Sequence, residues 1–271
     1  GTLPKCGAGW PAPGPPPIRR YAGRCGIALR PTHPITEHRV HDGRSLLARP
    51  PASPALAAIK ADALLYKSGK PFPWQGPLSL TRYLDRIAAT PADRAYALAW
   101  WTISGNGDPD RIAASEFLSS CSYGDGSPES MMTALAHTLV PGAGILAERM
   151  IAASGATLHL DAEVSSVADG IVTCADGRTI ASRVVISCLP LNALASIGFT
   201  PELAAPKRRA IDIGHGGRSI KLWLKVKGVQ PGILASGGPG GLRWLFAERE
   251  ARDGTALIVG FALTDGTLDP G

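Results

Sequence analysis

The sequence predicts a mixed fold, α/β with α+β character, in which helical and sheet-forming regions alternate along the chain. Three observations predict it: helical spacing over residues 55–138, a glycine loop followed by a strand meander over 139–193, and alternating apolar strands over 194–271. Together with a proline-rich segment at 1–54, these regions divide the chain into four parts. With 271 residues and 45% hydrophobic content, the chain is long enough to bury one or two cores.

The first part, residues 1–54, is predicted to be irregular. It holds eleven of the 24 prolines, including the run PAPGPPP, and it shows neither a strand period nor a helix period. Its apolar residues are too few to offset the entropy of ordering the chain, so we expect no packed core here. His33, His38 and His41 follow Cys25, but their spacing matches no zinc rule, and a solvated loop is favoured over a metal site.

Residues 55–138 are predicted to be mostly helical, because each apolar run has helical spacing and several runs follow a helix-capping residue. A serine, threonine or aspartate before proline or before the first apolar residue is typical of a helix N-terminus. The expected N-caps are Ser79, Thr90, Asp108 and Ser127. The last of these helices is expected to continue to residue 140.

Residues 139–193 begin with a glycine loop that opens a helix, and this helix is predicted to stop at Gly155. Alternating residues at 157–167, with turns at Asp169-Gly170 and Asp176-Gly177, then predict a meander of three short strands. The run at 184–187 is apolar on both faces, so we expect it to be a strand buried within a larger sheet.

Residues 194–271 are predicted to supply three further strands, at 217–228, 242–250 and 253–263. Side chains alternate between the two faces of a strand. In the first strand this alternation places Lys221 on the same face as Trp223 and Lys225, opposite Leu222 and Leu224.

Composition argues against several classes of protein. The net charge of +6 arises in residues 1–54, which carry eight Lys/Arg and two Asp/Glu, while the remainder is neutral, so a nucleic-acid partner is disfavoured. No apolar run approaches the roughly 20 residues of a membrane span. Five cysteines without a CxxC pair predict reduced thiols, a cytoplasmic location and no metal site.

The glycine loop also admits a different interpretation. Gly142-x-Gly144-x-x-Ala147, followed by a helix and Asp161, imitates the fingerprint of a dinucleotide-binding fold and would suit an NAD(P)-dependent reductase. That fingerprint requires a buried strand directly before the glycines, and the preceding residues predict a helix. Glycines that only turn the chain into a helix are therefore favoured.

The order of motifs over residues 139–227 resembles the flavin-containing amine oxidase family, which includes monoamine and polyamine oxidases. The shared motifs are a glycine loop that opens a helix, a strand with valine, a DG turn, a strand ending in V-I-x-C-x-P, an I-x-F-x-P-x-L segment and a strand with lysine. Here they are residues 142–146, Val164, residues 176–177, 185–190 and 197–203, and Lys221. The resemblance extends more loosely over 60–269.

The resemblance implies a partial FAD-binding domain over 139–193, interleaved with a substrate domain made of the helices at 55–138 and the sheet at 194–271. It implies an enzyme that oxidises a small-molecule amine, with FAD as cofactor and oxygen as acceptor. Lys221 would lie beside the flavin and assist oxygen reduction. Val164 would contact the adenine through its backbone, and Cys188 and Pro190 would lie at the cofactor end of the buried strand.

The family's opening glycine motif and its final cofactor-contacting segment have no match, so a fragment incomplete at both ends is expected. Trp223, Trp244 and Phe246 are candidates for a substrate wall, although core packing is the commoner role of such residues. Three alternatives stay open: a non-catalytic remnant or interaction module, an NAD(P)-dependent reductase, and a related flavoenzyme that desaturates carbon–carbon bonds.

Overall fold

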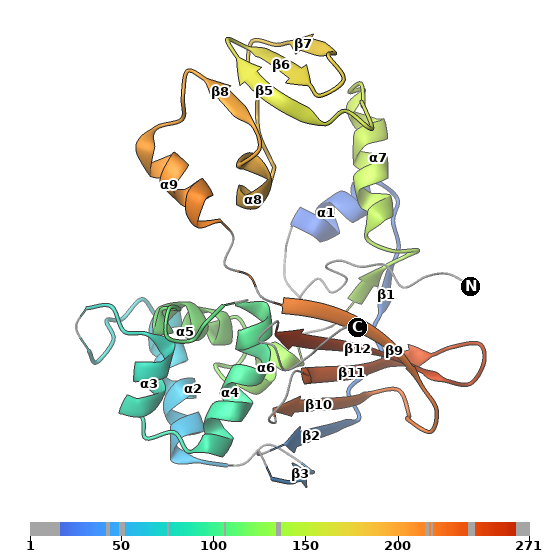
Figure 1. The fold of residues 1–271 in the computed structure, drawn as a ribbon. Helices are drawn as coiled ribbons and strands as arrows, with labels where there is room; N and C mark the ends of the chain where they lie inside the picture. Colours follow the sequence, from blue (N-terminus) through green and yellow to red (C-terminus); the bar gives the residue numbers. More distant parts are fainter. Residues whose placement is uncertain are drawn as a thin grey trace. The chain divides into compact units, whose positions relative to one another are not determined.

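The computed structural model describes most of the chain, which divides into two compact units (Figure 1). The described residues are 17–41, 44–48, 52–74, 76–105, 107–133, 137–214, 217, 219–237 and 242–263. Unit 1 joins residues up to 150 with those from 217 onward, and unit 2 comprises residues 151–216. Helices and strands occur in both, which confirms the predicted mixed fold class. Within the described residues, no helix is both long and apolar enough to cross a bilayer.

A six-stranded mixed sheet is the framework of unit 1. Its strand order is β3-β2-β10-β11-β12-β9, with β2 parallel to β10 and all other neighbours antiparallel. The strands are β2 (Glu37–His41), β3 (Leu46–Leu47), β9 (Ser219–Val226), β10 (Ile233–Gly237), β11 (Leu242–Glu250) and β12 (Ala256–Leu263). The three strands predicted after residue 216 are confirmed as β9, β11 and β12. The sequence does not predict β10, because its small residues and glycine give a weak strand signal.

Five helices follow one another in residues 54–132 of unit 1. They are α2 (Pro54–Lys67), α3 (Leu80–Arg86), α4 (Pro91–Ser104), α5 (Ala114–Ser122) and α6 (Pro128–Met132). Side chains of Ser79, Thr90 and Ser127 accept backbone N–H bonds at the starts of α3, α4 and α6, which confirms three predicted N-caps. Asp108 is not an N-cap, because its carboxylate accepts the N–H of Asp110 in a local turn and α5 begins only at Ala114.

Helix α4 joins the two cores of unit 1, because it contacts both the helix group and the sheet (Figure 1). The first core lies among the helices and includes Ile59, Tyr83 and Phe117, all fully buried. The second lies between α4 and one face of the sheet, where Tyr96 meets aliphatic and aromatic side chains of four strands. The strand residues are Val40, Leu234, Trp244, Phe246 and Val259.

Residues 17–48 contain regular structure, so the prediction that 1–54 is irregular is wrong for this stretch. Its elements are α1 (Pro17–Arg24), β1 (Leu29–Pro31), β2 and β3. Val40 and His38 of β2 are buried, whereas Arg39 between them is exposed. A strand this short with one large apolar residue is stable only when neighbouring strands supply its backbone partners, and those partners lie far away in sequence. Residues 1–16 lie outside the described residues.

The glycine loop follows a strand, which corrects the expectation of a helix from Ser127 to residue 140. Helix α6 ends at Met132, and β4 (His137–Leu139) pairs antiparallel with β1. A strand therefore does precede the glycines, yet its antiparallel partner gives no parallel βαβ unit, which a dinucleotide fingerprint needs. The next helix, α7 (Gly144–Ser154), ends before Gly155 at φ +66°, as predicted.

Unit 2 contains a four-stranded sheet in the order β7-β6-β5-β8. The elements are β5 (Val164–Ala168), β6 (Ile171–Cys174), β7 (Thr179–Ala181), α8 (Leu191–Leu194), β8 (Gly198–Thr200) and α9 (Ala205–Ile213). The turns after β5 and β6 place Gly170 and Gly177 at positive φ, which confirms the predicted three-stranded meander. β8 adds a parallel neighbour to β5.

Residues 184–187 do not form the predicted buried strand. They are irregular, and Val184 and Ile186 are 71% and 82% exposed. Leu158 and Leu160, in a segment also expected to be a strand, are 55% and 70% exposed. A β-branched run becomes a strand only against partner strands, and the sheet described in unit 2 pairs with neither segment.

Candidate active site

Lys221 lies on β9, the edge strand of the unit 1 sheet, opposite Phe261 on β12. Its Nζ is 5.4 Å from the ring centroid of Trp223 and 5.5 Å from that of Phe261. At these distances the ring faces attract a cation. The side chain is half-buried, so the two rings replace part of its hydration shell. These contacts confirm that Lys221 and Trp223 share one face of the sheet.

The three aromatic residues predicted for a substrate wall occupy two different settings. Trp244 and Phe246 are fully buried in the core between the sheet and α4, with ring centroids 6.1 Å apart. Trp223 is half-buried beside Lys221, and its buried Nε1 has no hydrogen-bond partner among the described residues. Core packing thus accounts for the positions of Trp244 and Phe246, and the substrate-wall role stays a prediction for all three.

Glu248 is a buried carboxylate on β11 that sequence reasoning did not single out. Its side chain is 7% exposed and lies where the pairing of β11 with β12 shifts register, between Ala247 and Arg249. Oε1 is 3.8 Å from Nη1 of Arg249, and Oε2 has no hydrogen-bond partner within the described part of the chain. Burial raises the pKa of Glu248, while the charges of Arg249, Arg30 and Lys221 lower it. Strand alternation was the missed signal, because Glu248 follows two core aromatic residues at alternate positions.

The residues predicted to contact the cofactor lie in unit 2. Val164 begins β5 and pairs with Cys174, and β8 pairs with β5 only from Ser166 onward, so β8 leaves the backbone of Val164 uncovered. Cys188 and Pro190 are exposed in irregular chain. Their roles stay predictions. A hollow of 150 Å³ beside Cys174 is lined by His159, Ala162, Cys174, Arg178, Thr179 and Ile180.

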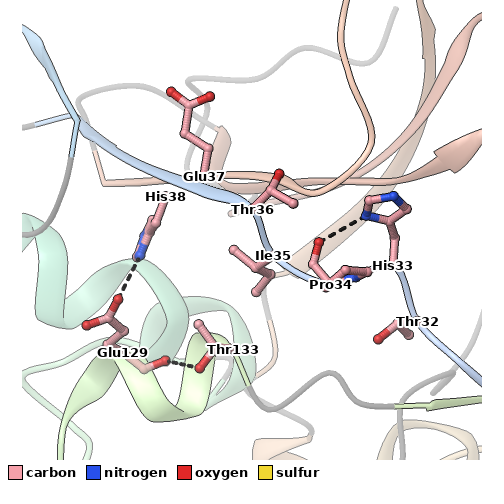
Figure 2. Close-up of a pocket in the computed structure, with 9 residues that line it drawn as sticks. All are labelled: Thr32, His33, Pro34, Ile35, Thr36, Glu37, His38, Glu129 and Thr133. Atoms are coloured by element: carbon pink, nitrogen blue, oxygen red, sulfur yellow. Dashed lines mark hydrogen bonds and ion pairs between the residues drawn. The ribbon is translucent and has the colours of Figure 1, made fainter.

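A larger pocket of 540 Å³ lies in unit 1, between the β1–β2 connection and α6 (Figure 2). It is lined by residues 32–38 together with Glu129 and Thr133, and by none of the residues predicted for the site. Figure 2 shows the His38 ring directed at the Glu129 carboxylate, while the Glu37 side chain points away from that pair. The sequence did not predict this pocket, because His38 lies in a proline-rich stretch where no strand β2 was expected.

His38 is the centre of a buried polar network. Its Nε2 is 2.8 Å from Ser236 Oγ and its Nδ1 is 3.5 Å from Glu129 Oε1, and its ring lies 5.9 Å from that of Tyr96. The order serine, imidazole, carboxylate imitates a hydrolytic triad, but Ser236 is 3% exposed and does not line the pocket, so no substrate carbonyl reaches it. Burial lowers the pKa of His38, and Glu129 opposes this in part, so the imidazole is neutral at neutral pH.

Comparison with known protein families identifies the chain. Residues 6–269 match the family model described as flavin containing amine oxidoreductase. The chain belongs to this family. The match confirms the resemblance seen in the sequence and extends it to residues before 60, where α1 and the first strands were missed.

The chain covers only part of the length of two curated relatives. It is 28% identical over 198 residues to (S)-6-hydroxynicotine oxidase of Paenarthrobacter nicotinovorans, covering 71% of this chain and 46% of that protein. It is 26% identical to pseudooxynicotine dehydrogenase of a Pseudomonas species, over 55% of this chain and 31% of that one. The chain therefore spans less than half the length of these curated relatives.

Solved structures with the same fold are also longer than this chain. Putrescine oxidase bound to putrescine superposes with a TM-score of 0.76 at 16% identity, covering 96% of this chain and 64% of that one. Cyclohexylamine oxidase from Brevibacterium oxydans gives a TM-score of 0.71 at 17% identity, with 93% and 64% covered. At such identities the likeness concerns the fold, and about a third of each of those chains has no counterpart here.

Proposed function

We propose that this chain is the central part of an FAD-dependent amine oxidase acting on a small-molecule amine, with oxygen as electron acceptor. One observation carries the proposal: Lys221 is half-buried against the rings of Trp223 and Phe261 on the edge strand of the sheet. The relatives named for putrescine, cyclohexylamine and 6-hydroxynicotine support an amine as the substrate class. A monoamine oxidase-like specificity is part of the proposal.

The residues present fit a bound FAD at two separate places. In unit 1, the buried Trp223 Nε1 without a partner in the described chain is a donor available to a ligand, next to the Lys221 cation. In unit 2, the backbone of Val164 is left uncovered by β8, as contact with an adenine edge requires. Cys188 and Pro190 are accessible for the contacts proposed for them.

Bound FAD supplies the acceptance of hydride equivalents from the carbon that bears the amine and their transfer to oxygen. The chain's own residues would stabilise charge that develops during the reaction. Lys221 provides a positive charge and N–H donors where negative charge develops during oxygen reduction, and it does so in partly water-excluded surroundings, where such charges act strongly. Trp223 and Phe261 hold the ammonium in place through their ring faces.

The domain assignment and the location belong to the same proposal. We assign residues 139–193 to a partial FAD-binding domain, and residues 55–138 and 194–271 to the substrate domain. Strands β2 and β3 join the substrate domain because they belong to its six-stranded sheet. A cytoplasmic location is supported by Cys25, Cys121, Cys174 and Cys188, which are all free thiols.

A second candidate is a non-catalytic remnant or interaction module, for which the exposed apolar side chains of Val184 and Ile186 would form a contact surface. Titration of the chain with FAD, and separately with NAD(P)H, distinguishes the candidates. Flavin fluorescence quenching supports the oxidase, binding of NAD(P)H alone supports a reductase, and binding of neither supports a remnant.

The direct test substitutes Lys221 in a flavin-loaded version extended at both ends to the length of its relatives. Lys221→Met keeps the stem and removes the charge, so flavin reoxidation by oxygen should slow, while anaerobic reduction by amine should suffer less. The matched control is Lys225→Met, on the same strand, where the exposed lysine pairs with Asp253 at 3.1 Å. Equal rates of flavin reoxidation by oxygen in the Lys221→Met variant and its parent would show that Lys221 does not assist oxygen reduction.

A further inference from the structure

The pocket between the β1–β2 connection and α6 has the size of a small-molecule site. Ligand pockets in proteins measure about 300–1,000 Å³, and this one measures 540 Å³. It lies far from the residues proposed to face the flavin, because His38 and Trp223 stand at opposite ends of one cross-strand row, with β10, β11 and β12 between them. Four strand spacings amount to roughly 19 Å.

The charge of this pocket comes from its acidic side chains. Glu37 and Glu129 are among the lining residues, and lysine and arginine are not. Glu37 forms an ion pair with Arg39 and points away from the His38–Glu129 pair (Figure 2). Burial lowers the pKa of His38, so its imidazole does not balance Glu129 at neutral pH. Glu129 therefore gives the pocket a negative charge that attracts cations.

The carboxylate of Glu129 is open to a stronger partner. Its Oε1 is 3.5 Å from His38 Nδ1, at the limit of a hydrogen bond, and no other side chain in the described part of the chain bonds to it. The nearby Asp125, in contrast, accepts bonds from Lys60 Nζ at 2.8 Å and from the N–H of Ser127 at 2.9 Å. Because the Glu129 side chain is 50% exposed, a ligand in the pocket reaches it and can form a charge-assisted hydrogen bond.

An organic cation fits the pocket better than a metal ion does. His38 and Glu129 together offer two ligands, whereas protein metal sites have three or more. The described residues contain no group of three side chains that could hold a metal. Ile35 and Pro34 line the same pocket, and Ile35 is half-buried against the second core. A carboxylate beside an apolar wall matches an alkylammonium ion, whose charge meets the carboxylate and whose chain covers the wall.

The wall made by the β1–β2 connection is held in place before any ligand binds. The N–H of Thr36 donates to the carbonyl of Gly232 at 2.9 Å. Gly232 has φ +93°, and a Cβ at this position would lie 2.6 Å from the carbonyl oxygen of Pro34, closer than such atoms approach. The connection thus packs directly on the backbone of Gly232. A wall fixed in this way lowers the entropic cost of binding.

We propose that this pocket binds a small organic ammonium ion, with the Glu129 carboxylate as its anchor and Ile35 as its apolar contact. The site goes beyond the proposed oxidase function, because it uses none of the residues assigned to the flavin. Binding needs neither flavin nor turnover, so its test is independent of the Lys221→Met experiment.

The first test uses the 271-residue chain without flavin, with n-butylammonium chloride as the probe. Isoleucine methyl groups are labelled with ¹³C, and the Ile35 signal is identified by its loss in Ile35→Val. This signal should shift and saturate with a Kd on the order of 1–10 mM. n-Butanol and sodium butyrate have the same chain length without the positive charge, and should bind at least about fivefold more weakly. The absence of a saturable shift, or equal binding of either control compound, overturns the proposal.

The second test removes the anchor. Glu129→Gln keeps the shape of the side chain without its charge, so the Kd for n-butylammonium should rise about 5- to 20-fold, a range that allows for the half exposure of the carboxylate. The matched control is Glu116→Gln, because Glu116 is also exposed in the first turn of a helix, α5. It should leave the Kd within about twofold of the parent.

Circular dichroism establishes that both variants keep the fold. A folded Glu129→Gln variant that binds n-butylammonium as tightly as its parent overturns the proposal. If Glu129→Gln does not fold, the comparison of n-butylammonium with n-butanol and butyrate in the parent chain decides the question, because it requires no change at Glu129.

Discussion

Replacing Phe246 by alanine tests whether the aromatic residues of β11 stabilise the core. Phe246 is fully buried, beside Trp244 and opposite Val259, in the core cluster that also contains Tyr96. Phenylalanine-to-alanine substitutions at such positions cost about 3–5 kcal/mol of unfolding free energy, through lost burial and the cavity left behind. A domain is stable by about 5–15 kcal/mol in total, so the loss is a large fraction of the whole. It corresponds to a fall in Tm of about 6–20 °C for a unit of roughly 200 residues.

The assay is urea denaturation of the chain followed by circular dichroism, with Leu224→Ala as the control. Leu224 lies in the same sheet, but it is 37% exposed on the opposite face of β9, so its loss should cost less than about 1 kcal/mol. Phe246→Leu restores much of the volume and should be milder than the alanine variant. If Phe246→Ala lowered the unfolding free energy no more than Leu224→Ala, Phe246 would not be a core residue, and this result would support the substrate-wall hypothesis.

Three further predictions concern other parts of the chain. Burial lowers the pKa of His38 in the folded state below 6.5, so the unfolded chain takes up a proton first as the pH falls. The contribution of His38 to stability should therefore be full above pH 6.5 and should decline below it. Denaturation midpoints at several pH values should reveal this slope, and a His38→Gln variant that kept the whole slope would contradict the prediction. Thr90 accepts the N–H of Asp93 in a capping box at the start of α4, so Thr90→Ala should cost about 1 kcal/mol, whereas Thr90→Ser should cost little; equal losses in chemical denaturation would refute the capping role. The exposed run at residues 184–189 should bind a hydrophobic dye and exchange its amide hydrogens quickly in the isolated chain, and strong protection there in hydrogen-exchange mass spectrometry would count against this account of unit 2.

Sequence reasoning was most successful where a local signal fixes a local structure. Serine and threonine caps defined the starts of α3, α4 and α6, because a side-chain oxygen two or three residues from free N–H groups needs no distant partner. Glycines in turns defined the meander of unit 2, because positive φ at Gly170 and Gly177 is a property of single residues. The order of such signals was also enough to indicate the family.

Prediction failed where stability comes from distant partners. β2 contains five residues with one large buried apolar side chain, Val40, and it exists because β10, nearly 200 residues later, pairs with it in parallel. The opposite failure occurred at Val184 and Ile186, where strong strand propensity produced no strand because no partner strand is described.

The sequence by itself determined the mixed fold class, three of the expected helix starts, the meander, the family, and the face of β9 that carries Lys221. Only the tertiary structure decided that Glu248 is buried beside Arg249, that His38 joins Ser236 and Glu129, and which aromatic residues are core. Capping and alternation act within a few residues, so they can be read from the chain. Burial and charge coupling depend on which segments meet in space, and that is settled only when the whole sheet has formed.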